Sequence, residues 1–426
     1  MSSMQPTTGG KSRLIRPFSG YSHTRRTCSY RQVAPGEHCQ QKFLLLPTLC
    51  LLACMRMYGQ DVSTPDVMAA PEWTALFCRT SGWFGGDGIF SIPLDGVEFP
   101  DAADRKGQET LLVFSDTYVG EVEDGRPLPG HVMVNNSAAI LRDGVPLEDH
   151  IDFHVRTDSD GRPVALFQPR PDGPQEHFWL GDGFVNRERN NRLYLFAYHI
   201  RVTGPGVFDF IEPDVSILRI PKGERPPFHR YRQLKTPFHL DLPEWGQTNL
   251  GAGLLVHTDW AGAPHADGFV YVYGCAGPGK HLVVARVRPR FFERYRKWRF
   301  WNGKEWGRNP LEMAPVAAGV SNELSVTPLP DGKFALVFQV FGLSDKVGLC
   351  IGDSPAGPFS PIREIWTTPE SGEGLLCYNA KAHPALSNPG ELLISYNTIT
   401  LDFWNDIRER AHIYRPRFIR LVWPAP

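Results

Sequence analysis

Phe178-Trp179-Leu180-Gly181-Asp182-Gly183-Phe184-Val185 is an apolar, β-type run interrupted by two glycines. A second β-type run, Leu193-Tyr194-Leu195-Phe196-Ala197, follows after a short polar stretch. Short apolar runs separated by turn residues predict neighbouring antiparallel strands. Working outward in both directions, the same order of strand-like runs and Gly/Pro/Asp turns recurs along the chain, and no amphipathic helix is evident. A repeat of this kind decides the fold before any single motif does.

Five such units account for the chain from residue 72 onward. They occupy residues 88–155, 181–231, 249–301, 322–366 and 378–421. The first four units have four strand-like runs each, and the last has only three. Five four-stranded units predict an all-β fold, a five-bladed β-propeller. We expect Trp73–Cys78 to supply the missing outer strand of the last blade, because a closed ring hides its sheet edges. The competing interpretation is a two-sheet β-sandwich, which would not require units that repeat in this order.

Composition and charge narrow the possible ligands. The 41 glycines and 38 prolines among 426 residues favour turns and short strands over long helices. Residues 1–56 hold eight of the 45 Lys/Arg and one of the 46 Asp/Glu, which leaves 37 basic and 45 acidic residues, a net charge of −8, for the rest. An acidic body is poorly suited to bind nucleic acid. Neutral ligands remain, and we expect a monomer.

The N-terminal region has the features of a targeting segment. The apolar run Phe43–Cys54 follows Lys42 and is too short to span a bilayer, but it suits the apolar region of a signal peptide. Cleavage would leave either a lipid anchor on Cys54 or a soluble protein starting near Gly59-Gln60, and a buried core strand is the alternative. We expect a leader at residues 1–59, in which 1–41 could be an over-extended start, and one propeller domain at 60–426. The protein would then be periplasmic, an outer-membrane lipoprotein or secreted.

Cysteines give no sign of a metal site. Four of the eight, Cys78, Cys275, Cys350 and Cys377, follow the predicted leader, and none forms a C-x-x-C pair. This spacing does not suit zinc. Since each lies in or beside a strand-like run, we expect buried free thiols rather than disulfides.

Acidic and neutral polar residues recur near the start of the predicted inner strands, which would bring them to one mouth of the channel. The positions are Asp87, Asp182, Asn249, Glu323 and the pair Asn379/His383, with Asp116 added at the end of a second strand. Carboxylates gathered in one narrow cavity repel each other and lose solvent, so at least one pKa should rise. Glycoside hydrolysis needs this arrangement, because one acid must stay protonated while another stays ionised.

Aromatic and amide residues near these acids are candidates for substrate binding. Trp83 and Trp179 each precede an Asp-Gly pair and could stack on a sugar ring. Neutral hydrogen-bonding candidates are Asn135, Asn136, Asn249, Tyr378, Asn379, His383, Tyr396 and Asn397. Each also has a structural alternative: Asp-Gly pairs form turns, Asp116 could cap one, and the amides could satisfy backbone. We predict no cofactor and no metal, although His383 with waters could hold a single ion in the channel.

Several stretches resemble the bacterial five-bladed propeller families known as domains of unknown function 4185 and 5005. They include Asp87-Gly88-Ile89-Phe90-Ser91-Ile92-Pro93, Asn322-Glu323-Leu324-Ser325-Val326 and Tyr378-Asn379-Ala380-Lys381-Ala382-His383-Pro384, and the resemblance covers roughly residues 72–423. Related proteins include endo-D-arabinan hydrolases. More distantly, Gly352–Phe359 resembles a blade turn of glycoside hydrolase family 43.

The resemblance implies a role for each acid. By it, Asp87 would be the base or nucleophile, Glu323 the general acid, and Asp182 or Asp116 the residue that modulates their pKa. We therefore expect an exported glycoside hydrolase acting on a neutral oligo- or polysaccharide, with furanose residues as in arabinan. The rival from another class is a noncatalytic glycan-binding propeller of a cell-surface assembly.

Overall fold

The computed structural model describes residues 65–170 and 176–424. The expected leader at 1–59, including Phe43–Cys54, lies outside the described residues. Within the described ranges, no helix is both long enough and apolar enough to cross a membrane.

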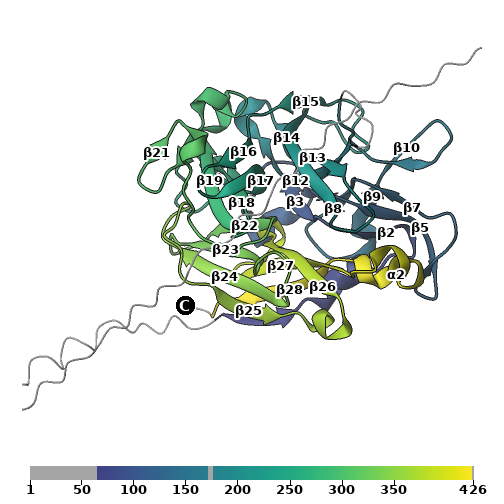
Figure 1. Ribbon diagram of the computed structural model, residues 1–426. Helices are drawn as coiled ribbons and strands as arrows, with labels where there is room; N and C mark the ends of the chain where they lie inside the picture. Colours follow the sequence, from purple (N-terminus) through teal and green to yellow (C-terminus); the bar gives the residue numbers. More distant parts are fainter. Residues whose placement is uncertain (1–64, 171–175, 425–426) are drawn as a thin grey trace, which may run out of the picture. The chain divides into compact units, whose positions relative to one another are not determined.

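β-Strands dominate the described chain, as its turn-rich composition predicts. The α-helices are short, α1 (Pro71–Leu76) and α2 (Phe403–Glu409). Five larger sheets follow one another along the sequence, and all their neighbouring strands are antiparallel (Figure 1).

The strands of these sheets have the following bounds. The first sheet contains β3 (Phe90–Pro93), β4 (Glu109–Phe114), β8 (Ser137–Arg142) and β9 (Ile151–His154). The second contains β12 (Glu176–Asn186), β13 (Arg192–Val202), β14 (Phe210–Ile220) and β15 (Arg232–Lys235). The third contains β16 (His239–Leu242), β17 (Gly246–His257), β18 (Phe269–Ala276), β19 (His281–Val287), β20 (Arg299–Trp301) and β21 (Trp306–Gly307). The fourth contains β22 (Leu324–Pro328), β23 (Phe334–Gln339), β24 (Lys346–Gly352) and β25 (Arg363–Thr367). The fifth contains β26 (Leu376–Ala382), β27 (Glu391–Ile399), β28 (Arg417–Val422) and β1 (Asp66–Ala69).

Two smaller sheets lie outside this series. One is formed by β2 (Ser81–Gly86), β5 (Thr117–Glu123), β6 (Arg126–Pro127) and β7 (Val132–Val134), and the other by β10 (Arg156–Thr157) and β11 (Pro163–Val164).

The outer strand of the fifth sheet comes from the N-terminal side, but not from the expected segment. β1, purple in Figure 1, pairs antiparallel with β28 from Asp66–Val422 to Ala69–Ile419. The prediction of a strand at Trp73–Cys78 is wrong, because this stretch forms α1 and the turn after it. Pro71 at the first helical position and Glu72 in the first turn favour a helix start.

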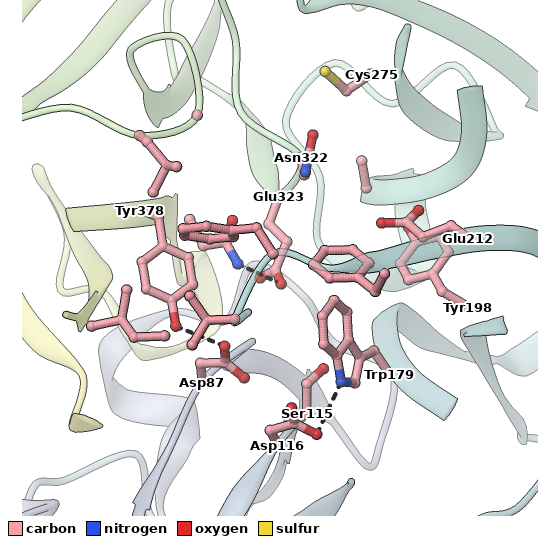
Figure 2. Close-up of a pocket in the computed structure, with 18 of the residues that line it drawn as sticks. Asp87, Ser115, Asp116, Trp179, Tyr198, Glu212, Cys275, Asn322, Glu323 and Tyr378 are labelled. Atoms are coloured by element: carbon pink, nitrogen blue, oxygen red, sulfur yellow. Dashed lines mark hydrogen bonds between the residues drawn. The ribbon is translucent and has the colours of Figure 1, made fainter. Parts of the chain in front are cut away.

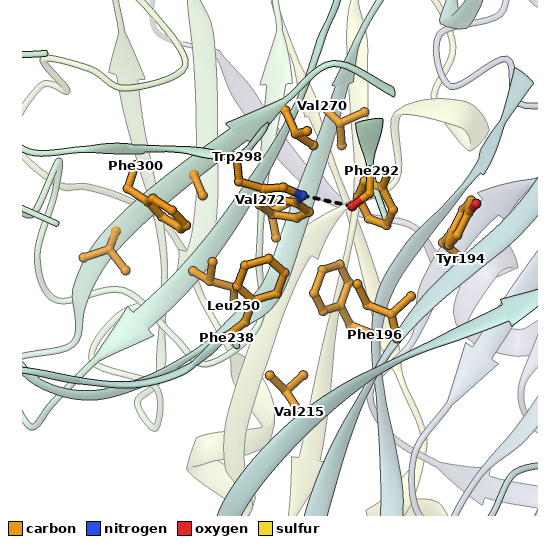
Figure 3. Packing of buried hydrophobic residues seen from close by; sticks show 14 of the residues in the cluster. Tyr194, Phe196, Val215, Phe238, Leu250, Val270, Val272, Phe292, Trp298 and Phe300 are labelled. Atoms are coloured by element: carbon orange, nitrogen blue, oxygen red, sulfur yellow. Dashed lines mark hydrogen bonds between the residues drawn. The ribbon is translucent and has the colours of Figure 1, made fainter. Parts of the chain in front are cut away.

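A separate apolar cluster fills each junction between neighbouring sheets. The cluster between the second and third sheets contains Trp298, which is 1% exposed (Figure 3). The Trp298 ring lies 4.3 Å from the Phe238 ring, and its Nε1 donates a 2.9 Å hydrogen bond to the Phe292 carbonyl. Other clusters join the first sheet to the second, the third to the fourth, the fourth to the fifth, and the fifth to the first. Burial of apolar side chains at every junction therefore fixes the sheets against one another.

One strand of each larger sheet, namely β3, β12, β17, β22 or β26, contacts its counterparts in the neighbouring sheets in sequence order. β12 contacts β3 and β17, and β22 contacts β17 and β26. Between the fifth and first sheets, His383 Nδ1 lies 3.0 Å from Ser91 Oγ.

Irregular pairing marks three of these strands at comparable places. The register shifts between Leu180 and Gly183 in β12, between Leu250 and Gly253 in β17, and between Tyr378 and Lys381 in β26. Extra residues of this kind re-aim the side chains beside them and are common next to functional sites. Asn379 takes a φ of 57° in the β26 irregularity, a conformation that asparagine tolerates better than most residues.

Candidate functional site

A cavity of about 360 Å³ receives side chains from all five larger sheets and their flanking loops. Its walls combine carboxylates with aromatic and other apolar side chains (Figure 2). Seven of the residues predicted for the site line it: Asp87, Asp116, Trp179, Asn249, Glu323, Tyr378 and Asn379. Half of the fourteen site residues predicted from the sequence therefore line one cavity.

Asp87 lies between β2 and β3, and its carboxyl group is poorly compensated. Its Oδ2 accepts a 2.7 Å hydrogen bond from the Tyr378 hydroxyl, whereas its Oδ1 is buried without a hydrogen-bond partner. Burial, followed by the charges of Asp116 and Glu323, raises the pKa of Asp87 to about 8. The Asp87 carboxyl therefore keeps its proton at neutral pH.

Asp116 follows β4 and is held by two donors from other segments. Its Oδ1 accepts 3.0 Å hydrogen bonds from Asn135 Nδ2 and from Trp179 Nε1. Burial raises the pKa of Asp116 to about 6, although the two hydrogen bonds oppose the rise. Trp179 is thus fixed by its indole N–H, and its ring packs edge-on against Phe210 at 4.6 Å.

Glu323 lies just before β22 and has the strongest positive partner of the three. Its Oε2 is 2.6 Å from Nζ of Lys381, which is 1% exposed, and its Oε1 accepts a 2.8 Å hydrogen bond from Asn379. Burial raises the pKa of Glu323, while Lys381 acts in the opposite direction. Lys381 therefore compensates the ionised form of this carboxylate.

The three carboxylates interact because their segments approach closely. A Cβ atom at Gly88 would lie 3.3 Å from Glu323 Oε1, so the residue after Asp87 leaves room for Glu323. Gly88 also has a φ of 64°, a conformation that other residues rarely adopt. Three neighbouring acids that share so little compensating charge cannot all ionise at once.

Asp182 occupies a different place from the other acids. It contributes to a cavity of about 40 Å³ that also receives Glu98, Lys381 and His383. The Asp182 oxygens accept hydrogen bonds from the backbone N–H groups of Gly183 and Leu254, at 2.8 and 2.6 Å. Burial raises the pKa of Asp182 to about 7, against the effect of these bonds. Its carboxylate thereby ties the β12 irregularity to β17.

Trp83 and Asn136 conflict with their predicted role in substrate binding. Trp83 is 3% exposed and stacks on Phe153 at 4.8 Å, inside the apolar cluster between the first and fifth sheets. The Asn136 amide is fully buried and bonds to Phe167 N–H, the Phe167 carbonyl and the Phe178 carbonyl. Both side chains are already used in packing and backbone pairing.

The remaining candidates are also engaged within the protein. Both ring nitrogens of His383 lie near serine hydroxyls, Ser91 at 3.0 Å and Ser395 at 2.7 Å, and burial lowers the pKa of His383 to about 3. The buried Tyr396 donates to Glu370 Oε2 at 2.7 Å, and Asn397 is 1% exposed. Asn135 reaches the site indirectly, through its bond to Asp116.

Three residues that sequence reasoning did not select contribute to the site. Glu212 on β14 and Tyr414 after α2 line the cavity, and Lys381 forms an ion pair with Glu323. Glu212 precedes a proline within a strand, so no local motif distinguished it. Lys381 could have been suspected, because a lysine in a buried strand needs a nearby carboxylate.

Metal ligands and disulfides are absent from the described residues. No group of three or more His, Cys, Asp or Glu side chains there could hold a metal ion. The four cysteines expected as thiols are unpaired in the described ranges, with Cys350 and Cys377 buried. Cys78 is exposed, contrary to the expected burial, and Cys275 lines the cavity.

One solved structure shows a similar fold, and two others align more weakly. A Bacteroides ovatus protein, described provisionally as a hydrolase, aligns with a TM-score of 0.63 at 19% identity, covering 83% of this chain and 89% of that chain. An exo-β-1,3-galactanase from Phanerochaete chrysosporium with β-1,3-galactotriose gives 0.41 at 9% identity, covering 76% and 63%. A family 62 glycoside hydrolase with xylotriose also gives 0.41 at 9% identity, covering 81% and 99%. Only the first likeness is close enough to show the fold, and none establishes an activity.

Sequence comparison identifies the family. A search of curated proteins finds no significant match. The sequence profile of one family matches residues 71–423, which include every strand described above except β1. The chain therefore belongs to the family described as domain of unknown function DUF5005.

Proposed function

We propose that the five larger sheets are the blades of one five-bladed β-propeller and that the 360 Å³ cavity, near the starts of β3, β12, β17, β22 and β26, is the active site of a glycoside hydrolase. The cyclic order of contacts from β3 through β12, β17, β22 and β26 supports the propeller. The pairing of β1 with β28 would close the ring.

One observation carries the enzymatic part of the proposal. Asp87, Asp116 and Glu323 come from three separate segments and meet in one cavity, where the pKa of Asp87 is raised to about 8. Glycoside hydrolysis requires a protonated acid beside an ionised carboxylate. The cavity would supply both, because Lys381 opposes the rise that burial causes in the pKa of Glu323.

These surroundings favour roles opposite to those that the resemblance implies. Asp87, protonated at neutral pH, would donate its proton to the glycosidic oxygen of the leaving group. Glu323, ionised beside Lys381, would attack the sugar or activate water. Asp116 would modulate the pKa of Asp87, which its charge raises. Asp182 would act as a structural residue, because both of its oxygens are bonded to backbone.

The lining favours a neutral sugar substrate. Four carboxylates line the cavity, Asp87, Asp116, Glu212 and Glu323, together with a single lysine, Lys280. An anionic sugar would be repelled. Trp179, Phe210 and Phe341 offer apolar faces for sugar rings. A furanose polysaccharide such as arabinan is the proposed substrate on the resemblance to endo-D-arabinan hydrolases alone.

Location and cofactor use are proposed from the sequence. The predicted leader supports export, as a periplasmic or secreted protein or as a lipoprotein anchored at Cys54. The protein would act as a monomer on oligo- or polysaccharide without a cofactor.

Paired variants test the proposed chemistry. Mature wild-type protein is screened for turnover of arabinan, xylan and galactan, followed by Asp87→Asn and Glu323→Gln. We expect Asp87→Asn to lose polysaccharide turnover by about 10²–10⁴-fold while cleaving aryl glycosides whose leaving group needs no proton. Glu323→Gln should lose both activities and keep glycan binding.

The control is Asp160→Asn, an exposed turn residue between β10 and β11. Unchanged turnover in Asp87→Asn and Glu323→Gln would refute the catalytic assignment. Glycan binding by a wild-type protein that hydrolyses none of the panel would favour the noncatalytic propeller.

A further inference from the structure

The wall of the cavity formed by β14 and β17 holds polar side chains that the proposed catalytic step does not use. Glu212 and Asn249 line the cavity there, with Lys280 and Asn322 nearby. Figure 2 shows Glu212 beside Tyr198, on the other side of the cavity from Asp87 and Tyr378.

Hydrogen bonds fix the orientation of Glu212 from behind. His239 Nδ1 donates to Asn249 Oδ1 at 3.0 Å, and Asn249 Nδ2 donates to Glu212 Oε2 at 3.1 Å. Because both ends of the Asn249 amide are used, it holds one oxygen of the Glu212 carboxylate in a defined place. Among the described residues, no donor bonds to the other oxygen, Oε1.

Glu212 is half-buried, and its Oε1 remains open to the cavity, where it can accept a hydrogen bond from a ligand. Burial raises the pKa of Glu212, and Lys280 opposes this rise. Lys280 itself stays at the rim, where its Nζ donates to Asn322 Oδ1 at 2.8 Å. A donor on the ligand would complete the hydrogen bonding of Glu212.

Apolar side chains beside this wall form surfaces of the size of a sugar ring. Tyr198 and Phe210 line the cavity on the same sheet as Glu212. Phe341 is 61% exposed at the cavity rim, from the turn after β23. An oriented carboxylate in a cavity that aromatic side chains also line is suited to bind a hydroxylated ring.

We propose that Glu212, oriented by Asn249 and His239, binds the hydroxyl groups of a second neutral sugar residue, adjacent to the one at Asp87 and Glu323. This inference rests on the proposed function and specifies its substrate: a chain of at least two sugar residues, both held within one cavity. Glu212 is then a specificity-determining residue rather than a group that takes part in bond cleavage.

Binding as a function of chain length tests the subsite. Arabino-oligosaccharides of one to five residues, with xylo- and galacto-oligosaccharides in parallel, are titrated calorimetrically into the Glu323→Gln protein with and without Glu212→Ala. We expect Glu212→Ala to weaken binding of oligosaccharides by about 10- to 100-fold, the range for a hydrogen bond to a charged group, and to leave monosaccharide binding unchanged. In the active background KM should rise while kcat changes little. Glu176→Gln, on the same sheet and paired with Arg201, is the control.

Each alternative result has a defined meaning. Equal weakening for monosaccharides and oligosaccharides, or no weakening, overturns the subsite while leaving the proposed hydrolase intact. Selective binding of glucosamine oligomers that Glu212→Gln abolishes would show an ammonium site and overturn the hydroxyl assignment. If no glycan binds and none is hydrolysed, the subsite and the proposed function both fail.

Discussion

Replacing Asp87 by asparagine should change how stability depends on pH. The unfolded chain loses the Asp87 proton near pH 3.8, whereas the folded protein keeps it up to about pH 8. Between these values the folded state binds more protons, so its free energy of unfolding falls as the pH rises. The Asp87→Asn protein carries no such proton and should lack this part of the slope.

The pKa difference sets the size of the effect. About four pKa units at 1.36 kcal/mol each give an upper limit of about 5 kcal/mol. Coupling to Asp116 and Glu323 lowers this value, because the same proton can move among the three acids. We expect Asp87→Asn to match the wild type near pH 4 and to exceed its stability by several kcal/mol at pH 8. A gain of this kind at the cost of function is typical of active sites.

Urea unfolding at intervals from pH 4.5 to 8.5 measures the effect, with Asp160→Asn as the surface control. Parallel pH profiles for wild type and Asp87→Asn would refute the raised pKa. A lower stability of Asp87→Asn at pH 8 would show that the asparagine disrupts packing instead of relieving a buried charge.

Two further substitutions separate support of the site from support of the fold. Lys381→Met leaves Glu323 buried beside no cation and should cost about 3–5 kcal/mol of unfolding free energy. In urea unfolding, the Lys381→Met/Glu323→Gln double variant should be more stable than the sum of the two single effects predicts. Strict additivity of the two effects would show that the side chains do not interact. Asn136→Ala leaves three buried backbone groups at Phe167 and Phe178 without partners and should cost about 3 kcal/mol. Turnover per folded molecule, measured well below the melting temperature, should be unchanged in Asn136→Ala, and a large fall in kcat would place Asn136 in the site after all.

The turn residues of the sequence explain why most strands of the fold can be predicted. Each larger sheet is built from strands joined by turns, and glycine and proline mark such turns within a few residues. β1 contains only Asp66–Ala69, and three of its four residues are exposed, so no buried apolar run marks it as a strand. The sequence does not distinguish α1 from a strand by its apolar residues, because Trp73, Leu76 and Phe77 are apolar in either conformation; Pro71 and Glu72 are the signals of a helix start.

The site was only half predictable, since strand register decides which side chains reach the cavity. Asp87 and Asp182 share an Asp-Gly pattern, yet Asp87 pairs through its backbone with Ser115 and Asp116, whereas Asp182 lies within the β12 irregularity. A one-residue difference in register sends a side chain to another face. The role proposed for Glu212 depends on hydrogen bonds that involve Asn249 and His239. Both residues belong to another sheet, so no sequence pattern near Glu212 predicts this contact.

The pairing of β1 with β28 also imposes an order on folding. During synthesis, Asp66–Ala69 leave the ribosome long before their partners Ile419–Val422 have been made. Until then β1 has no partner strand, and the fifth sheet cannot be completed during synthesis.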